Sequence, residues 1–417
     1  MKFPLLLILS PIFALLTAGA AIAANPASPP VTRNWMPPEL AQLAIGSPAP
    51  DFTLPGIDGR SHSLKDFAKA DVLMVLFTSN HCPTSHGIEL RLMKLWNDFR
   101  NKGFALVAIN PNNPDGLSLD ELGYGEFGDS FAEMKPYAKK NGWDFPYLYD
   151  GDKQLTARAY GCLATPHVFI FDKERKLRYQ GRFDDSRFSQ EETVKSPDAR
   201  NAVAALLAGK VVPVAITKPH GCSTKWRERK PAHAAHEQSW KNLPVELADI
   251  DAGGIRALRA NPTPNYRLVN VWATWCAPCV EEFPDIVSIT RRLGLREFEL
   301  ITLSLDEEKA AGRAKAFLEK QGAGTSPRTA KSLKAEGRVT NNYRYTGASQ
   351  DELAAALDPE WPGPIPHTIL IAPGGEIVWR QNGPIEMKSA LSAILNVMTP
   401  FYQPPKPAKA PGMASVP

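Results

Sequence analysis

The sequence has few cysteines, no strongly charged segment and almost no long apolar run. Five cysteines occur among 417 residues, and the formal net charge is only +4. No basic run carries interleaved aromatic side chains, so nothing indicates nucleic-acid binding. After residue 24, no stretch is apolar enough to span a membrane. The remaining composition is that of an ordinary globular protein, and the length predicts two domains of about 150 to 200 residues each.

Residues 1–24 have the pattern of a secretory signal peptide. Lys2 supplies a positive charge, residues 3–18 an apolar region, and residues 21–23 a small-residue cleavage site. We therefore expect a periplasmic or secreted protein, in a compartment where disulfide bonds form and persist. An uncleaved membrane anchor is the alternative, because the apolar region is nearly long enough to cross a bilayer.

Cys276 and Cys279 form a Cys-x-x-Cys motif at the end of an apolar run. Residues 269–284 read VNVWATWCAPCVEEFP, which predicts a strand followed directly by a helix. The first cysteine would lie at the helix N-terminus, where the backbone dipoles favour a thiolate. This placement predicts Cys276 as a nucleophile that attacks disulfides and Cys279 as its resolving partner. A structural disulfide is the alternative. A zinc site would need a second cysteine pair, and the other three cysteines are scattered singly, so no metal is expected.

These residues resemble the thioredoxin superfamily, and within it the TlpA-like extracytoplasmic thiol–disulfide interchange proteins. Asn270 stands where thioredoxin keeps a buried aspartate, and Glu282 where TlpA-like proteins carry an active-site glutamate. The resemblance implies a thiol–disulfide oxidoreductase without a cofactor. It also implies reduction of protein thiol/disulfide clients, fed by a membrane or periplasmic electron donor.

Glu282 is also a candidate from its position alone. It follows Cys279 by three residues, so the two side chains would share one helix face. A partly buried carboxylate there can take the proton from Cys279 as this cysteine attacks a mixed disulfide. The alternative is a solvated surface glutamate like its neighbour Glu281.

Two prolines are predicted to face the active-site cysteines. In the superfamily, a cis-proline faces the Cys-x-x-Cys motif, and the residue before it offers backbone hydrogen bonds to the bound substrate. Ile365-Pro366 and Thr165-Pro166 stand at equivalent places after Cys276 and Cys82. An ordinary trans-proline entering a strand is the alternative. The residues predicted to contact substrates are Trp275, Pro278, Ile365, Pro366, Thr165 and Pro166.

An earlier part of the chain resembles the redoxins, the family of the alkyl hydroperoxide reductases and thiol-specific antioxidant proteins. The resemblance rests on GSPAPDFTLP at residues 46–55 and on the later segments SNHCP, ATPHVFIFD and GCSTKW. It places Cys82 at the active-site corner of a thioredoxin-like domain. Ser85 stands where the second active-site cysteine would be, so Cys82 has no local resolving partner.

Several roles for Cys82 remain open at this point. It pairs with Cys162, or with Cys222, or it acts as a lone thiol that holds substrates as mixed disulfides. A peroxidase role is disfavoured because Val75 and Ser79 replace the proline and threonine of the peroxiredoxin motif. A metal role with His86 would need a second thiolate. The last alternative is that this domain only docks clients or partners and that Cys82 is incidental.

The predicted architecture is α/β, with two tandem thioredoxin-like domains that each have a central mixed β-sheet flanked by helices. The segment 324–363 is predicted to be an insertion flanking the site, and residues 368–372 and 376–380 a hairpin. The predicted divisions are a signal peptide at 1–24, a Pro-rich tether at 25–45, domain 1 at 46–222, a linker at 223–242, domain 2 at 243–401 and a disordered tail at 402–417.

Overall fold

The computed structural model describes residues 40–398, 400 and 402. The predicted signal peptide lies outside the described residues, as do most of the predicted tether and nearly all of the predicted tail. In this described part, no helix combines the length and the apolar character needed to cross a bilayer. The domain boundaries given above stay predictions.

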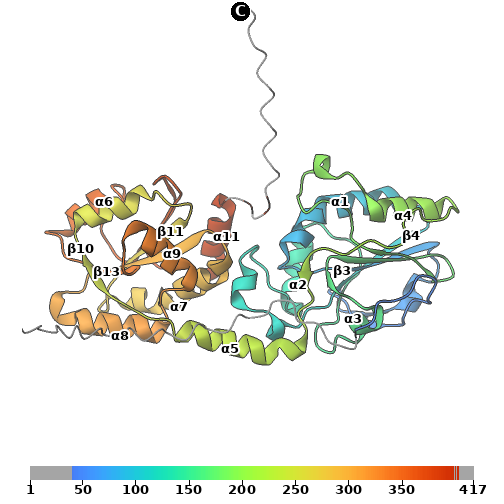
Figure 1. Ribbon diagram of the computed structural model, residues 1–417, viewed down its shortest axis with the longest axis horizontal. Helices are drawn as coiled ribbons and strands as arrows, with labels where there is room; N and C mark the ends of the chain where they lie inside the picture. The colour runs from blue at the N-terminus through green and yellow to red at the C-terminus, as the bar shows by residue number, and fades with distance from the viewer. Residues whose placement is uncertain (1–39, 399, 401, 403–417) are drawn as a thin grey trace, which may run out of the picture. The chain divides into compact units, whose positions relative to one another are not determined.

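The first large sheet is mixed and centres on β3 (Figure 1). Its strand order is β5-β4-β3-β7-β8, in which β3 runs parallel to β4 and antiparallel to β7. The central strand β3 reads VLMVLF, and every residue of it is buried, as expected for a strand covered on both faces. The strands are β3 Val72–Phe77, β4 Phe104–Asn110, β5 Tyr147–Tyr149, β7 His167–Phe171 and β8 Leu177–Gly181.

Alternate residues of β3 contribute to two apolar clusters, one on each face of the sheet. Met74 and Leu76 pack with residues of α1, α2 and α4, while Val75 and Phe77 pack with residues of α3. The helices are α1 Pro83–Phe99, α2 Phe131–Lys140, α3 Leu155–Tyr160 and α4 Asp198–Leu207. Two short antiparallel pairs complete this part, β1 Thr53–Pro55 with β2 Ser61–Ser63 and β6 Ala164–Thr165 with β9 Cys222–Ser223.

The second large sheet has the order β10-β13-β12-β11-β14-β15. Its central strand β11 is parallel to β12 and antiparallel to β14, which repeats the pattern around β3. The strands are β10 Ala248–Ile250, β11 Tyr266–Trp272, β12 Phe298–Ser304, β13 Asn342–Tyr345, β14 His367–Ile371 and β15 Ile377–Asn382. The last two strands form the predicted hairpin.

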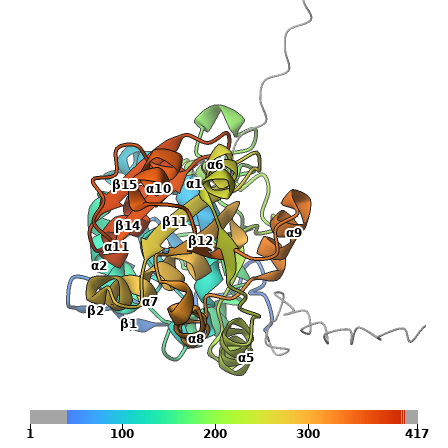
Figure 2. The same cartoon turned by 90° about the vertical axis from the view of Figure 1, so that its left-hand side faces the viewer.

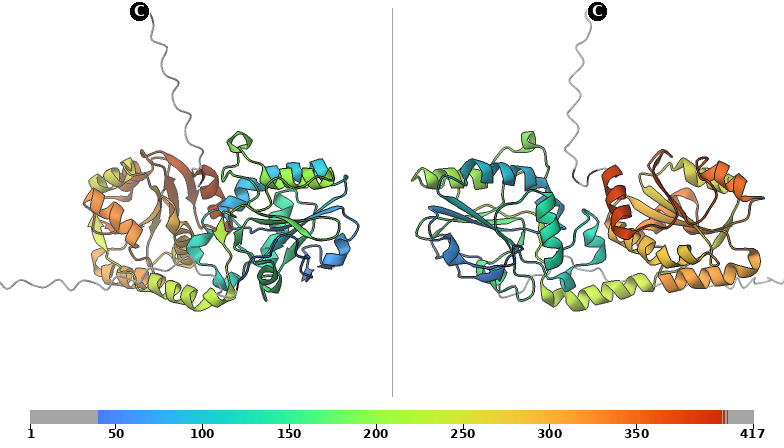
Figure 3. Two further views of the ribbon diagram at one scale, coloured as in Figure 1. Left: turned by 45° about the vertical axis from the view of Figure 1, so that its right-hand side comes forward. Right: turned by 180° about the vertical axis from the view of Figure 1, so that it is seen from behind.

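Helices cover both faces of this sheet, as they do for the first (Figures 2 and 3). Residues of α6 and α10 pack against Val269 and Val271, and residues of α7 and α11 pack against Leu268. Each sheet is therefore the middle layer of a three-layer α/β arrangement. The helices of this part are α6 Ala252–Ala260, α7 Ala277–Arg292, α8 Ala311–Gln321, α9 Pro327–Glu336, α10 Gln350–Leu357 and α11 Met387–Val397.

The segments 324–363 and 223–242 differ from what the sequence suggested. The first supplies α9, β13 and α10, and β13 lies between β10 and β12 in the sheet, so it belongs to the core and is not an added insertion. The strand was missed because it is short and polar, with Asn342 and Arg344 among its residues. The predicted linker contains the helix α5, Lys230–Lys241.

Candidate active site

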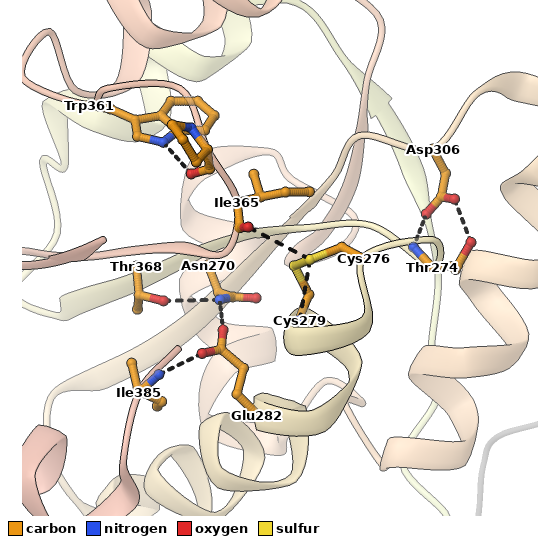
Figure 4. Close-up of a disulfide and its surroundings, with 11 residues drawn as sticks. Asn270, Thr274, Cys276, Cys279, Glu282, Asp306, Trp361, Ile365, Thr368 and Ile385 are labelled. Atoms are coloured by element: carbon orange, nitrogen blue, oxygen red, sulfur yellow. Dashed lines mark hydrogen bonds between the residues drawn. A yellow bond between two sulfur atoms is a disulfide. The ribbon is translucent and has the colours of Figure 1, made fainter. Parts of the chain in front are cut away.

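Cys276 and Cys279 lie where β11 gives way to α7, and their sulfur atoms form a disulfide (Figure 4). Cys276 is the N-cap residue of the helix, and its Sγ accepts a 3.3 Å hydrogen bond from the backbone N–H of Cys279. The two Cα atoms are 5.3 Å apart. In the reduced form, this N–H and the positive end of the helix dipole would both stabilise a thiolate at Cys276.

The two sulfurs differ in access to solvent. The Cys276 side of the pair is 6% exposed, whereas Cys279 is fully buried. Trp275, directly before the pair, is 64% exposed and presents a large apolar surface beside it. Pro278, in the first turn of α7, is exposed as well. An incoming sulfur therefore meets Cys276 first, as the predicted roles require.

A cis peptide bond joins Ile365 to Pro366, which confirms the conformation expected for this proline. The carbonyl oxygen of Ile365 lies 3.8 Å from the Sγ of Cys276, so this loop faces the disulfide (Figure 4). Trp361 supports the loop from behind, because its ring stacks on His367 with centroids 4.9 Å apart and its Nε1–H donates to the carbonyl of Pro364. The role of Ile365 in substrate binding stays a prediction.

Glu282 is buried, with an exposed fraction of 4%, while Glu281 beside it is exposed. The surface alternative for Glu282 is therefore wrong. One carboxylate oxygen accepts from Asn270 Nδ2 at 3.0 Å, and the other accepts from the N–H of Ile385 at 2.7 Å (Figure 4). Burial raises the pKa of Glu282 to about 7, although both hydrogen bonds oppose the shift. A carboxylate with this pKa can accept and release a proton near neutral pH.

Two polar contacts around the pair were not found from the sequence. Asn270 also donates to Thr368 Oγ1 at 3.0 Å, so β11 and β14 together hold the amide that binds Glu282. Asp306, after β12, accepts from the N–H and the hydroxyl of Thr274 at 2.9 and 2.6 Å. The only available signal for Asp306 was that it follows the carboxyl end of a strand parallel to β11.

Cys82 occupies in the first sheet the place that Cys276 has in the second. It is the N-cap residue of α1 after β3, and it is fully buried. The bond between Thr165 and Pro166 is cis, as predicted, and the carbonyl oxygen of Thr165 lies 3.0 Å from the Cys82 sulfur. Ser85 is buried at the position of Cys279.

The structure brings Cys222, and not Cys162, to Cys82. All three are free thiols. Cys222 is paired with Thr165, whose carbonyl oxygen contacts the Cys82 sulfur, whereas the Cys162 sulfur lies 3.4 Å from the carbonyl of Ala164 and 3.5 Å from Thr224 Oγ1. Burial raises the pKa of the Cys162 thiol to about 12. A pairing of Cys82 with Cys162 therefore has no support in the geometry.

His86, the other residue of the metal alternative, is engaged elsewhere. Its Nε2 lies 2.6 Å from the carbonyl oxygen of Asn80. Within residues 40–398, 400 and 402, no group of three histidine, cysteine or acidic side chains is placed to hold a metal ion.

Comparison with known proteins finds similarity both to redoxins and to thiol–disulfide oxidoreductases. Residues 45–180 match the AhpC/TSA family. The chain is 26% identical over 140 residues to the thiol-disulfide oxidoreductase ResA of Geobacillus thermodenitrificans, which covers 34% of this chain and 70% of that protein. It is 32% identical over 124 residues to a Mycobacterium tuberculosis protein provisionally named as a peroxiredoxin, covering 29% of this chain and 67% of that protein.

Solved structures give a further similarity. A hypothetical protein from Sinorhizobium meliloti is 36% identical, with a TM-score of 0.40, and the match covers 45% of this chain and 96% of that one. The names of the two sequence relatives both refer to sulfur redox chemistry.

Proposed function

Because the chain belongs to the thioredoxin superfamily, with a redoxin domain and the oxidoreductase activity of that superfamily, we propose that Cys276 and Cys279 exchange disulfides with protein clients. The observation that carries the proposal is the geometry of this pair. Cys276 is slightly exposed and caps α7 opposite the cis-proline loop. Cys279 is buried, and the following turn of α7 carries Glu282.

The reduced pair would act in two steps. The Cys276 thiolate attacks one sulfur of a client disulfide, which forms a mixed disulfide and releases one client thiolate. Glu282 then takes the proton of Cys279, and the Cys279 sulfur attacks Cys276 and releases the second client sulfur as a thiolate. Two electrons pass to the client, and the enzyme is left with the Cys276–Cys279 disulfide.

We place the protein outside the cytoplasm and assign it the reductase direction. The signal-like pattern at residues 1–24 supports the location. In this direction, a membrane or periplasmic dithiol donor would have to reduce Cys276–Cys279 again after each turnover. The redox equilibrium of the pair tests the direction, because a reductase needs a couple more reducing than its clients.

A second candidate function applies to residues 46–222, which would then serve only as a docking module. Ser85 in place of a second active-site cysteine and the full burial of Cys82 favour this reading. A Cys82→Ser variant with unchanged turnover and unchanged client trapping would support it.

The trap variant Cys279→Ser tests the main proposal. Without its resolving cysteine, Cys276 should stay covalently joined to its clients, and mass spectrometry would identify them after release with dithiothreitol. Cys276→Ser is the matched control and should trap nothing. Equal amounts of captured protein in the two variants would contradict the proposed roles.

A further inference from the structure

Cys82 and Cys222 come together although they lie 140 positions apart in the sequence. Cys222 lies on β9, directly opposite Thr165 of β6 in an antiparallel pair. The carbonyl of the same Thr165 is 3.0 Å from the Cys82 sulfur. The two thiols therefore lie close together beside this residue, and each influences the pKa of the other.

Gly221 explains how the backbone before Cys222 approaches the cis-proline loop so closely. A Cβ atom at this position would lie 2.0 Å from the carbonyl oxygen of Thr165 and 3.1 Å from Pro166. Only a residue without a side chain allows this contact. The glycine and the cysteine of the GCSTKW segment thus have distinct roles, one in close packing and one at the Cys82 sulfur.

A buried histidine–aspartate pair stands next to Cys82. Nδ1 of His81 lies 2.5 Å from Asp129 Oδ2, and both residues are almost fully buried. Asp129 is held in turn by the N–H of Asn80 at 2.8 Å and by Asn112 Nδ2 at 2.7 Å. Nε2 of His81 is buried without a hydrogen-bond partner among the described residues.

The charges of these groups distinguish the two thiols. Burial opposes an imidazolium at His81, yet the charge and hydrogen bond of Asp129 raise its pKa. Burial likewise opposes a thiolate at Cys82, but the hydrogen bond from Cys222 and the charge of His81 hold the pKa of Cys82 well below its usual range. The hydrogen bond to Cys82 raises the pKa of Cys222, with burial adding to it. These effects favour a thiolate at Cys82 over a thiolate at Cys222.

We propose that Cys82 and Cys222 form a second redox couple, which in its disulfide form takes two electrons from a protein dithiol. Solvent access and charge both indicate that the substrate attacks Cys222 first. Cys222 is partly exposed whereas Cys82 is buried, and the groups around Cys82 favour it as the leaving thiolate. The substrate thiolate attacks the Cys222 sulfur, the Cys82–Cys222 bond breaks, and Cys82 leaves as the thiolate that His81 and the N-terminus of α1 stabilise.

The second step completes the transfer. The other thiol of the substrate attacks the substrate sulfur in the mixed disulfide and expels Cys222, which takes up the proton of that thiol. The products are a substrate disulfide, a Cys82 thiolate and a Cys222 thiol. The reverse exchange with an external disulfide restores the oxidised couple. Because a stabilised leaving thiolate favours the reduced form, the couple should be oxidising.

The test uses the full chain with Cys276→Ser and Cys279→Ser, so that no linkage can form through that pair. The protein is equilibrated in glutathione buffers, free thiols are blocked, and disulfide-linked peptides are mapped by mass spectrometry. We expect a Cys82–Cys222 linkage whose midpoint ratio [GSH]²/[GSSG] is at least tenfold lower than that of Cys276–Cys279 measured in a Cys82→Ser chain. A linkage through Cys162, or glutathione adducts alone, would overturn the proposal.

Two further variants test the role of the buried charge. His81→Gln should raise the midpoint ratio about tenfold, because the Cys82 thiolate loses a neighbouring positive charge. Asp129→Asn should shift it in the same direction, which keeps the test valid if one variant does not fold. Cys162→Ala is the matched control and should change neither linkage nor midpoint. An unchanged midpoint ratio in a folded His81→Gln variant would show that His81 does not stabilise the Cys82 thiolate.

Discussion

At the scale of single residues, Glu282 shows what the fold adds to a position in the sequence. Its place one turn after Cys279 suggested a proton acceptor, but the same spacing also fitted a surface side chain. Its burial and its contacts with Asn270 and Ile385 decide between these readings. The sequence contains no sign of Ile385, because this contact depends on how a distant backbone N–H is placed.

The raised pKa of Glu282 predicts a pH-dependent cost to stability. The folded protein binds this proton with a pKa of about 7, against 4.5 as the ordinary value, so it holds more protons than the unfolded chain between these pH values. Stability from this group is therefore lost as pH rises from about 5 to 8, by about 2 to 3 kcal/mol. Urea unfolding of the wild type and Glu282→Gln at pH 5 and pH 8 should show a smaller pH dependence in the variant. Equal pH dependence would contradict the burial argument.

The same substitution predicts a defect in one chemical step. Glu282→Gln cannot accept the proton of Cys279, so the mixed disulfide at Cys276 should resolve about 100-fold more slowly near pH 7.5. Rapid acid quenching of a reaction with a single-disulfide protein, followed by mass analysis, measures this intermediate. Glu281→Gln, the exposed neighbour, is the matched control and should behave as the wild type. Normal resolution in Glu282→Gln would leave the carboxylate without a role in proton transfer.

At the scale of elements, the strands and helices that flank the cysteines could be predicted because their apolar patterns are strong. β3 is a continuous apolar run and β11 is mostly apolar, and both are central strands. The short polar strand β13 could not be recognised, since its pairing with β12 depends on distant residues. The buried ion pair between Arg267 of β11 and Glu299 of β12 could not be predicted either. An arginine at the start of a strand is expected at the surface, but Arg267 is fully buried.

Arg267 should therefore contribute strongly to the stability of β11. Its guanidinium contacts Glu299, the carbonyl of Leu258 and Glu336, and Arg267→Met would leave buried acidic groups with fewer partners. We expect a loss of about 3 kcal/mol in the free energy of unfolding. Arg328→Met removes an exposed pair with Glu297 and should cost less than about 1 kcal/mol. Similar losses for both variants in urea unfolding would contradict this difference.

At the scale of the whole molecule, the two sheets place a cysteine in the same way and differ in its partner. Each has a cysteine at a helix N-terminus after the central strand and a cis-proline opposite. In the second sheet, the partner follows in the next helical turn and could be predicted from the motif. In the first, the serine at that place left three choices, and only the pairing of β6 with β9 brings Cys222 to Cys82.

The equilibrium of Cys276–Cys279 with glutathione tests the central claim most directly. The full chain with Cys82→Ser, Cys162→Ala and Cys222→Ser would be equilibrated over a range of glutathione ratios and the two cysteines assayed by alkylation and mass analysis. If the protein is a reductase, the Cys276–Cys279 pair should exchange with glutathione within minutes at neutral pH and should be more reducing than glutathione. A pair that is inert toward glutathione, or is strongly oxidising, would contradict the account.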